Sequence, residues 1–149
     1  MSSIVDALYH LKFHPFKYGE YVASFYSSAN DVEANLLLAP LVIPLCSHHV
    51  FAEKLKNVNR RSSLWSVFDD RAMLYDLQER IDEFKGLTEQ CIQYCLLNDW
   101  LEIDSKNLML HYSANTSTSV LQRNAVNLGR LVNGHSVVEV YAFLGVRPQ

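Results

Sequence analysis

The chain has 149 residues, with 13 Lys and Arg against 16 Asp and Glu, 49% hydrophobic residues and a formal net charge of −3. This composition excludes a disordered, collagen-like or purely charged chain and predicts one soluble globular domain. A compact chain of this size buries roughly 68–70% of its unfolded surface, so it needs neither a metal nor a disulfide to hold a core. The acidic balance disfavours a protein that works mainly by neutralising phosphates.

Cysteine use and apolar stretches predict a cytoplasmic protein. Cys46, Cys91 and Cys95 are too few, and odd in number, for a disulfide framework. The N-terminal residues lack the basic and apolar regions of a secretory signal, so we expect a reducing, cytoplasmic compartment. The longest apolar stretch, Leu36–Cys46, is much shorter than the about 20 residues of a membrane-spanning helix. It is predicted to be a buried element, with no role at a membrane.

The first part of the chain predicts two helices. Residues Lys17–Ala29 place aromatic and apolar side chains at positions i, i+3, i+4 and i+7, which is one helical face. Asn30, with an acidic residue three positions later, can cap a second helix that runs into Leu36–Cys46. Pro40 and Pro44 are expected to kink or interrupt that helix.

The next part mixes charge with a few apolar anchors. Residues Ser47–Arg61 predict a surface helix followed by a loop. The apolar anchors of that helix are Val50, Phe51 and Leu55. Residues Ser62–Asp70 predict a short helix capped by its serines. Its apolar side is expected to consist of Leu64, Trp65 and Phe68.

A pair of helices and a hairpin are predicted next. Arg71–Phe84 has the clearest helical period, and Lys85 and Gly86 are expected to end this helix. Thr88 is then expected to cap a second helix over Glu89–Asn98. The period then changes to two over residues 101–104 and 108–112, with a turn at 105–107. A helix, a turn, a helix and a hairpin in this order are typical of a winged helix domain.

The C-terminal part predicts two more helices. A polar connector at 113–119 precedes a helix over Val120–Val132, which Asn133 and Gly134 end. Ser136 then caps a last short helix that Gly145 stops. The predicted fold is thus mainly α with a small β-hairpin, a single-domain helical bundle containing a winged helix-turn-helix. Within the domain 1–149 we expect a helical part at about 1–70, the winged helix at about 71–112 and C-terminal helices at about 116–145.

The charge of the predicted winged helix argues against direct DNA reading. Between Gly86 and His111 the acidic residues outnumber the basic ones, since Lys106 is the single cation there. The acidic residues are Glu89, Asp99, Glu102 and Asp104. Phosphate contacts need the opposite balance, so a scaffold or protein-binding role is favoured over a winged-helix DNA-binding regulator, which stays as the alternative.

A basic segment offers a better candidate for a binding surface. It consists of Lys54, Lys56, Arg60 and Arg61. Most such segments are solvated loops, while the functional interpretation is contact with an acidic partner surface or a nucleic-acid backbone.

Neither a metal site nor an active site is predicted. His48, His49, Cys91 and Cys95 are residue types that bind zinc, but the two cysteines fall on the apolar face of a helix, where free thiols are usually core residues. The sequence contains no hydrolase, zinc-protease, phosphate-loop or dinucleotide-binding motif. We therefore expect a protein without catalytic residues or cofactors.

The aromatic residues divide between a core and a partner surface. Phe84 and Trp100 are expected in the core. Phe84 lies on the apolar face of its predicted helix, and Trp100 lies at the junction of helix and hairpin. A second group is a source of partner contacts, and it consists of Tyr9, Phe13, Phe16 and Tyr141.

Five stretches carry a resemblance to a known family. They are HPFKYGEYVASFY, LLLAPLVIPLCSHHVFAEKL, SSLWSVF, RIDEFKGLTEQCIQYCLLNDWLEI and LGRLVNGHSVVEVYAFLGVRP. In this pattern of apolar positions and turns, the chain resembles the small middle component of bacterial three-component ABC-ATPase systems, the group that includes the Lamassu-type anti-phage defences.

The resemblance implies a non-catalytic adaptor that joins an SMC-like coiled-coil ABC ATPase to an effector, often a nuclease, in a complex that senses foreign DNA. ATPase and nuclease chemistry would then lie in other chains. Leu128–Arg130 and Tyr141–Arg147 match the family pattern, either as packing or as interface residues. The predicted partner-binding residues are Lys54, Lys56, Arg60, Arg61, Tyr141, Phe143 and Arg147.

Overall fold

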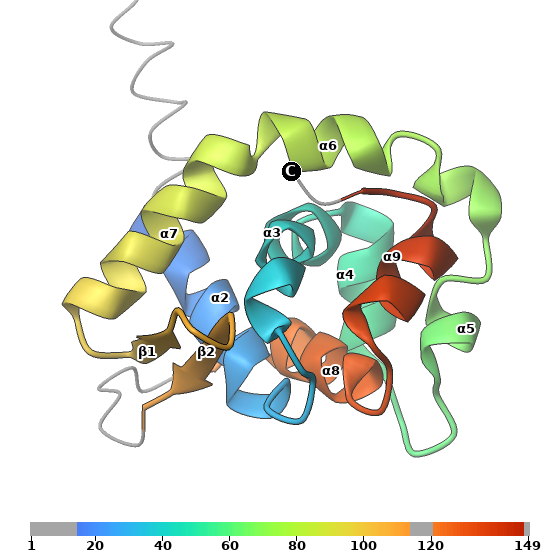
Figure 1. Cartoon of the computed structure of the whole chain (residues 1–149). Coiled ribbons are helices and arrows are strands. Elements are labelled where there is room, and N and C mark those ends of the chain that lie inside the picture. Colours follow the sequence, from blue (N-terminus) through green and yellow to red (C-terminus); the bar gives the residue numbers. More distant parts are fainter. Residues whose placement is uncertain (1–14, 114–120, 148–149) are drawn as a thin grey trace, which may run out of the picture.

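The computed structural model describes residues 15–113 and 121–147 and is mainly helical, with one two-stranded antiparallel sheet (Figure 1). The elements in chain order are α2 (Pro15–Ser28), η1 (Asn35–Leu38), α3 (Ala39–Cys46), α4 (His49–Lys56), α5 (Leu64–Val67), η2 (Arg71–Leu74), α6 (Leu77–Glu83), α7 (Lys85–Leu97), β1 (Leu101–Asp104), β2 (Met109–Tyr112), α8 (Arg123–Val132) and α9 (Val137–Leu144). Every one of these elements contributes at least one side chain to a single hydrophobic core.

Helices α2 and α8 pack directly against each other. The predicted helix at Lys17–Ala29 is confirmed, and Val22 and Phe25 on its predicted face are buried. The two backbones come close because α8 carries Gly129 at the contact: a Cβ there would lie 2.5 Å from the carbonyl oxygen of Phe25. The Ser28 hydroxyl donates a hydrogen bond to the Val126 carbonyl at 2.7 Å, which ties α2 to α8.

The segment between α2 and α3 differs from the prediction. No helix begins at Asn30; the chain turns instead, and Ala34 adopts a left-handed conformation (φ 58°) before the 3₁₀ turn η1. Pro40 lies in the first turn of α3, where its missing N–H costs nothing, and Pro44 lies inside the helix. The prediction of an early helix was wrong because a buried polar side chain, Asn35, organises this turn through contacts with distant elements.

Helices α4 and α5 agree with the sequence prediction in position. Phe51 and Leu55 anchor α4 in the core. Ser63 caps α5 in a capping box with Ser66, as its serines predicted. Trp65 departs from the prediction: its side chain is 47% exposed and packs on Phe143 at the surface.

The predicted long helix at Arg71–Phe84 is divided in the structure. It consists of η2 and α6, and α7 begins at Lys85, directly after Phe84. Gly86 therefore lies inside α7, and the prediction that it ends a helix was wrong. Thr88, the expected cap, is likewise inside α7 and buried. In Figure 1, α6 and α7 run in succession around the outside of α3.

The predicted hairpin is confirmed. Strands β1 and β2 pair antiparallel, with Leu101 opposite Tyr112 and Ile103 opposite Leu110. Leu108, placed at the start of the second strand by its alternation, belongs instead to the turn, where its φ is 54°. The structure does not confirm a winged helix, because α6 and α7 meet at Phe84 without the multi-residue turn of a helix-turn-helix.

The two C-terminal helices end as predicted, but α8 begins at Arg123 and not at the predicted start Val120, since Leu121 and Gln122 precede the helix. Asn133 follows α8, and Ser136 caps α9 by accepting a hydrogen bond from the Glu139 N–H at 3.1 Å. Gly145 ends α9 with φ 73°, a left-handed conformation that glycine adopts without strain. The connector predicted at 113–119 lies outside the described residues beyond Ser113.

Among the described residues, no single helix has the length and apolarity to cross a membrane. The stretches Asn35–Cys46 and His49–Lys56 meet those criteria only when taken together, as a pair bent by 105°.

Candidate functional site

Helix α4 carries half of the predicted basic segment, and its start is set by an unusual cap. The Nδ1 atom of His48 accepts hydrogen bonds from the N–H groups of Val50 (3.2 Å) and Phe51 (3.4 Å). Burial lowers the pKa of His48 below its usual value of 6.5, and the nearby positive charge of Arg80 lowers it further. A neutral imidazole is therefore the form that accepts these two hydrogen bonds and caps α4, the helix that carries Lys54 and Lys56.

A polar pocket of about 320 Å³ lies on one side of α4. Three cationic side chains from three different helices line it: Lys17 of α2, Lys56 of α4 and Arg123 of α8. Glu53 of α4 adds one carboxylate, and the ring of Tyr21 adds an aromatic surface. We call this hollow the cationic pocket. Of its cations, sequence reasoning found only Lys56, because the others are distant in the chain and lie in segments without a charge pattern.

A second, shallower groove of about 370 Å³ lies elsewhere along α4 and is lined by Lys54, Asn57 and residues of the α4–α5 connection. Here Lys54 pairs with Asp69 at 3.4 Å between Nζ and Oδ1. Both side chains of this pair are exposed, so it contributes little to stability. The structure thus separates Lys54 from Lys56, although they are two residues apart on the same helix.

Arg60 and Arg61 lie on the turn that follows α4, and both are exposed. The side chain of Asn59 shapes this turn by accepting a hydrogen bond from the Arg61 N–H at 2.9 Å. Neither arginine lines the described pockets beside α4. The four predicted cations therefore do not form one patch: they are divided between two hollows and a loop.

The predicted C-terminal partner residues have different environments. Tyr141 is 5% exposed, and its hydroxyl donates a hydrogen bond to the Leu37 carbonyl, so the structure places it in the core and not on a surface. Phe143 is partly exposed and lies with its ring centroid 4.1 Å from that of Trp65. The guanidinium of Arg71 lies 4.8 Å from the Phe143 ring centroid, on the same cluster.

Arg147 is exposed, and its backbone is held by α6. The Arg147 N–H donates to the Gln78 side chain at 2.7 Å, and the Gln78 amide donates back to the Arg147 carbonyl at 3.2 Å. Contacts of Phe143 and Arg147 with a partner protein stay predictions. Tyr9, Phe13 and the side chain of Phe16, also proposed as partner residues, lie outside the described part.

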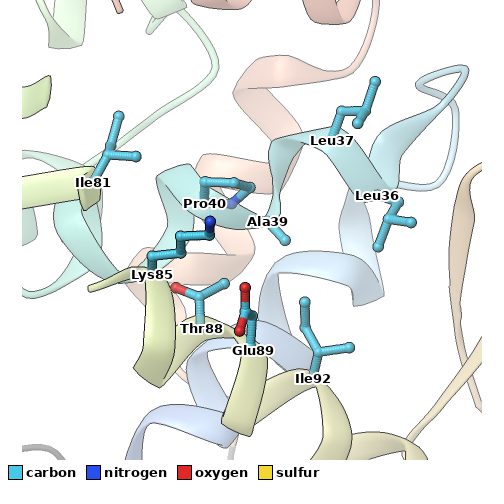
Figure 2. Close-up of a pocket in the computed structure, with 9 residues that line it drawn as sticks. All are labelled: Leu36, Leu37, Ala39, Pro40, Ile81, Lys85, Thr88, Glu89 and Ile92. Carbon is cyan, nitrogen blue, oxygen red and sulfur yellow. The ribbon is translucent and has the colours of Figure 1, made fainter. Parts of the chain in front are cut away.

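An apolar pocket of about 210 Å³ separates η1 and the start of α3 from α6 and α7. Figure 2 shows Lys85, Thr88 and Glu89 side by side on α7, with Pro40 and Ala39 across the pocket from them. Thr88 is 4% exposed, and its hydroxyl has no hydrogen-bond partner among the described residues. The pocket is lined mainly by aliphatic carbon, which suits an apolar side chain.

The cysteines are buried and weakly acidic. Burial raises the pKa of Cys91 and of Cys95 to about 12, so both are neutral thiols at physiological pH. The Cys95 thiol donates a hydrogen bond to the Gly19 carbonyl at 3.3 Å across the contact of α2 and α7. Within the described ranges, no group of three or more His, Cys, Asp and Glu side chains is arranged to hold a metal ion.

The fold is that of a small, mainly helical protein. Its surface has the cationic pocket and a shallower groove beside α4, and the apolar pocket between α3 and α7. A comparison with protein-family models matches residues 2–148 to the family described as ABC-three component (ABC-3C) system Middle Component 3, MC3. The chain belongs to this family, which confirms the resemblance to the middle component of three-component ABC systems. Searches of curated proteins and of solved structures find no match.

Proposed function

We propose that this chain is a non-catalytic adaptor subunit, which bridges an SMC-like ABC ATPase and an effector nuclease in a cytoplasmic, Lamassu-type complex that acts against phages or plasmids. The observation that carries the proposal is the match of residues 2–148 to a middle component of ABC-three component systems. The family description names a system of several components, so a role in contacts between components follows from it. The ATPase and nuclease activities belong to the other subunits in this proposal.

The exposed surface supports an adaptor role. Large apolar side chains are exposed at several places, including Leu97 at the end of α7, which is 84% exposed, and Trp65. Trp65, Phe143 and the guanidinium of Arg71 form a surface cluster of the composition that protein interfaces favour. The apolar pocket between α3 and α7 is a second place where a partner side chain fits.

The DNA-binding regulator is not favoured as an alternative. The helix-turn-helix that it requires is not confirmed, and the hairpin with the end of α7 carries Asp99, Glu102 and Asp104 against Lys106 alone. In our proposal, DNA is bound by the complex and the hairpin contacts protein.

Co-expression with the neighbouring open reading frames tests the adaptor role. With a tag on this chain, we expect a large ATPase and an effector to co-purify in a fixed ratio. Replacing exposed Trp65 by Ala removes the centre of the surface cluster and is expected to weaken that retention. Tyr75→Ala, which removes an exposed aromatic side chain outside the surface cluster and the hairpin, is the matched control. Recovery of the chain alone, in soluble form and at all salt concentrations, would refute the adaptor role.

A further inference from the structure

The cationic pocket is a compact site with an excess of positive charge in a chain whose formal net charge is −3. Lys17, Lys56 and Arg123 reach it from three helices, and no ion pair joins any of them to an acidic residue among the described ones. Glu53 is the one carboxylate in the lining. Lys54 of the same segment is paired with Asp69 and does not line this pocket.

One wall of the pocket is aromatic. The rings of Tyr18 and Tyr21 are stacked, with centroids 5.9 Å apart and planes at 28°. Both tyrosines line the pocket: Tyr18 is buried and has the Lys17 ammonium 5.6 Å from its ring centroid, while Tyr21 is only partly buried. A ring held in this way offers a flat surface on which a heteroaromatic base can stack.

The polar groups of the pocket are held in place by the fold. Asn124 donates a hydrogen bond to the Cys46 carbonyl at 3.0 Å, which fixes the start of α8 against the end of α3. Gln122 is held on α2 by the Ser24 hydroxyl, which accepts from its N–H at 2.8 Å. Because these contacts fix the start of α8, Arg123 in its first turn stands at a defined place beside the pocket.

The combination of groups selects a class of ligand. Three cations suit a chain of phosphates, a partly exposed tyrosine ring suits a base, and a carboxylate can accept hydrogen bonds from ribose hydroxyls. A volume of about 320 Å³ lies at the lower end of the range for small-molecule sites. An acidic protein surface would use the cations but would leave the aromatic wall without a partner.

We propose that the cationic pocket binds a free nucleoside triphosphate, with its phosphates on Lys17, Lys56 and Arg123, its base on Tyr21 and its ribose beside Glu53. This site would give the subunit a ligand of its own, and it stands independently of the adaptor role because it uses only residues of this chain.

The test is a titration of the full chain, followed by NMR or by calorimetry, with four probes: a nucleoside triphosphate, the matching nucleoside, inorganic tripolyphosphate and a short single-stranded oligonucleotide. We expect the triphosphate to bind more tightly than each of the other three. Lys56→Gln and Arg123→Gln are each expected to weaken it by about tenfold, the effect of losing one charge-assisted hydrogen bond. Lys54→Gln, on the same helix but outside the pocket, is the matched control and should leave binding unchanged.

The two variants alter exposed side chains, so loss of folding does not confuse the result, and circular dichroism checks this directly. Equal affinity for triphosphate and tripolyphosphate would overturn the base contact and with it the proposal. Tighter binding of the oligonucleotide would overturn it in favour of a nucleic-acid backbone. Absence of triphosphate binding at millimolar concentration, or an equal loss in Lys54→Gln, would also overturn it.

Discussion

The buried side chain of Asn35 allows a sharp test of how this fold is held together. It is fully buried, and its amide donates to the Ala29 carbonyl at 2.8 Å and to the Leu110 carbonyl at 3.1 Å. Its oxygen accepts from the Leu110 N–H at 2.7 Å, and its own carbonyl accepts from the Tyr26 hydroxyl at 2.8 Å. Asn35 thus joins the end of α2, the turn before η1 and strand β2.

Asn35→Ala removes the three side-chain hydrogen bonds and leaves three buried backbone groups, two at Leu110 and one at Ala29, without partners. An unsatisfied buried polar group costs about 1–3 kcal/mol, and partial filling of the gap by water reduces the sum. We therefore expect a loss of about 3–5 kcal/mol in the free energy of unfolding. Since domains of this kind are stable by about 5–15 kcal/mol, the change is large.

Urea unfolding followed by far-UV circular dichroism and tryptophan fluorescence measures this loss. Asn57→Ala is the control, because the Asn57 amide also donates to a backbone carbonyl, that of Glu53 at 3.0 Å, but at the surface. We expect the control to change stability by less than about 0.5 kcal/mol. A loss below about 1 kcal/mol for Asn35→Ala would refute the idea that this amide is a central connection of the fold.

Three further predictions concern close packing, an unpaired hydroxyl and a titrating cap. Gly129→Ala should lower the free energy of unfolding by about 1–3 kcal/mol or more, because its Cβ would collide with the Phe25 carbonyl. Gly86→Ala, which has open space around its Cβ in α7, should raise the free energy of unfolding by about 0.4–1 kcal/mol in the same urea assay. Thr88→Val should raise the thermal midpoint and add about 1 kcal/mol, since it removes a buried hydroxyl without a partner; a loss of stability would show that the hydroxyl is satisfied. His48 has a lowered pKa in the folded state, so its contribution is complete above pH 6.5 and is lost as the pH falls through the folded pKa. Unfolding free energies between about pH 7 and pH 5 should therefore fall more steeply for the wild type than for His48→Asn, and equal slopes would contradict the cap.

Local signals in the sequence determined several elements correctly. The face of α2, the capping box of α5, the alternation of the hairpin and the cap and stop of α9 each depend on residues a few positions apart. Ser136 needs only the N–H of Glu139, and Gly145 needs only its own freedom to adopt φ 73°. Such features are visible in a sequence because the groups that satisfy them are neighbours in the chain.

Contacts between distant residues decided the rest. A turn stands where a helix start was expected, because the partners of Asn35 include the distant residue Leu110. Helix α7 starts directly after Phe84 and continues through Gly86, which does not adopt the positive φ of a glycine that ends a helix. Tyr141 can be buried because its hydroxyl donates a hydrogen bond to the Leu37 carbonyl.

The candidate site follows the same division. The basic segment and the family resemblance were visible in the sequence, and the family is confirmed. The cationic pocket was not visible, since Lys17 and Arg123 join Lys56 only after α2, α4 and α8 have packed together. Helix capping and hydrophobic periodicity depend on residues within one or two helical turns, so they can be recognised in the sequence. A pocket is formed by surfaces of several packed elements, which only the tertiary structure brings together.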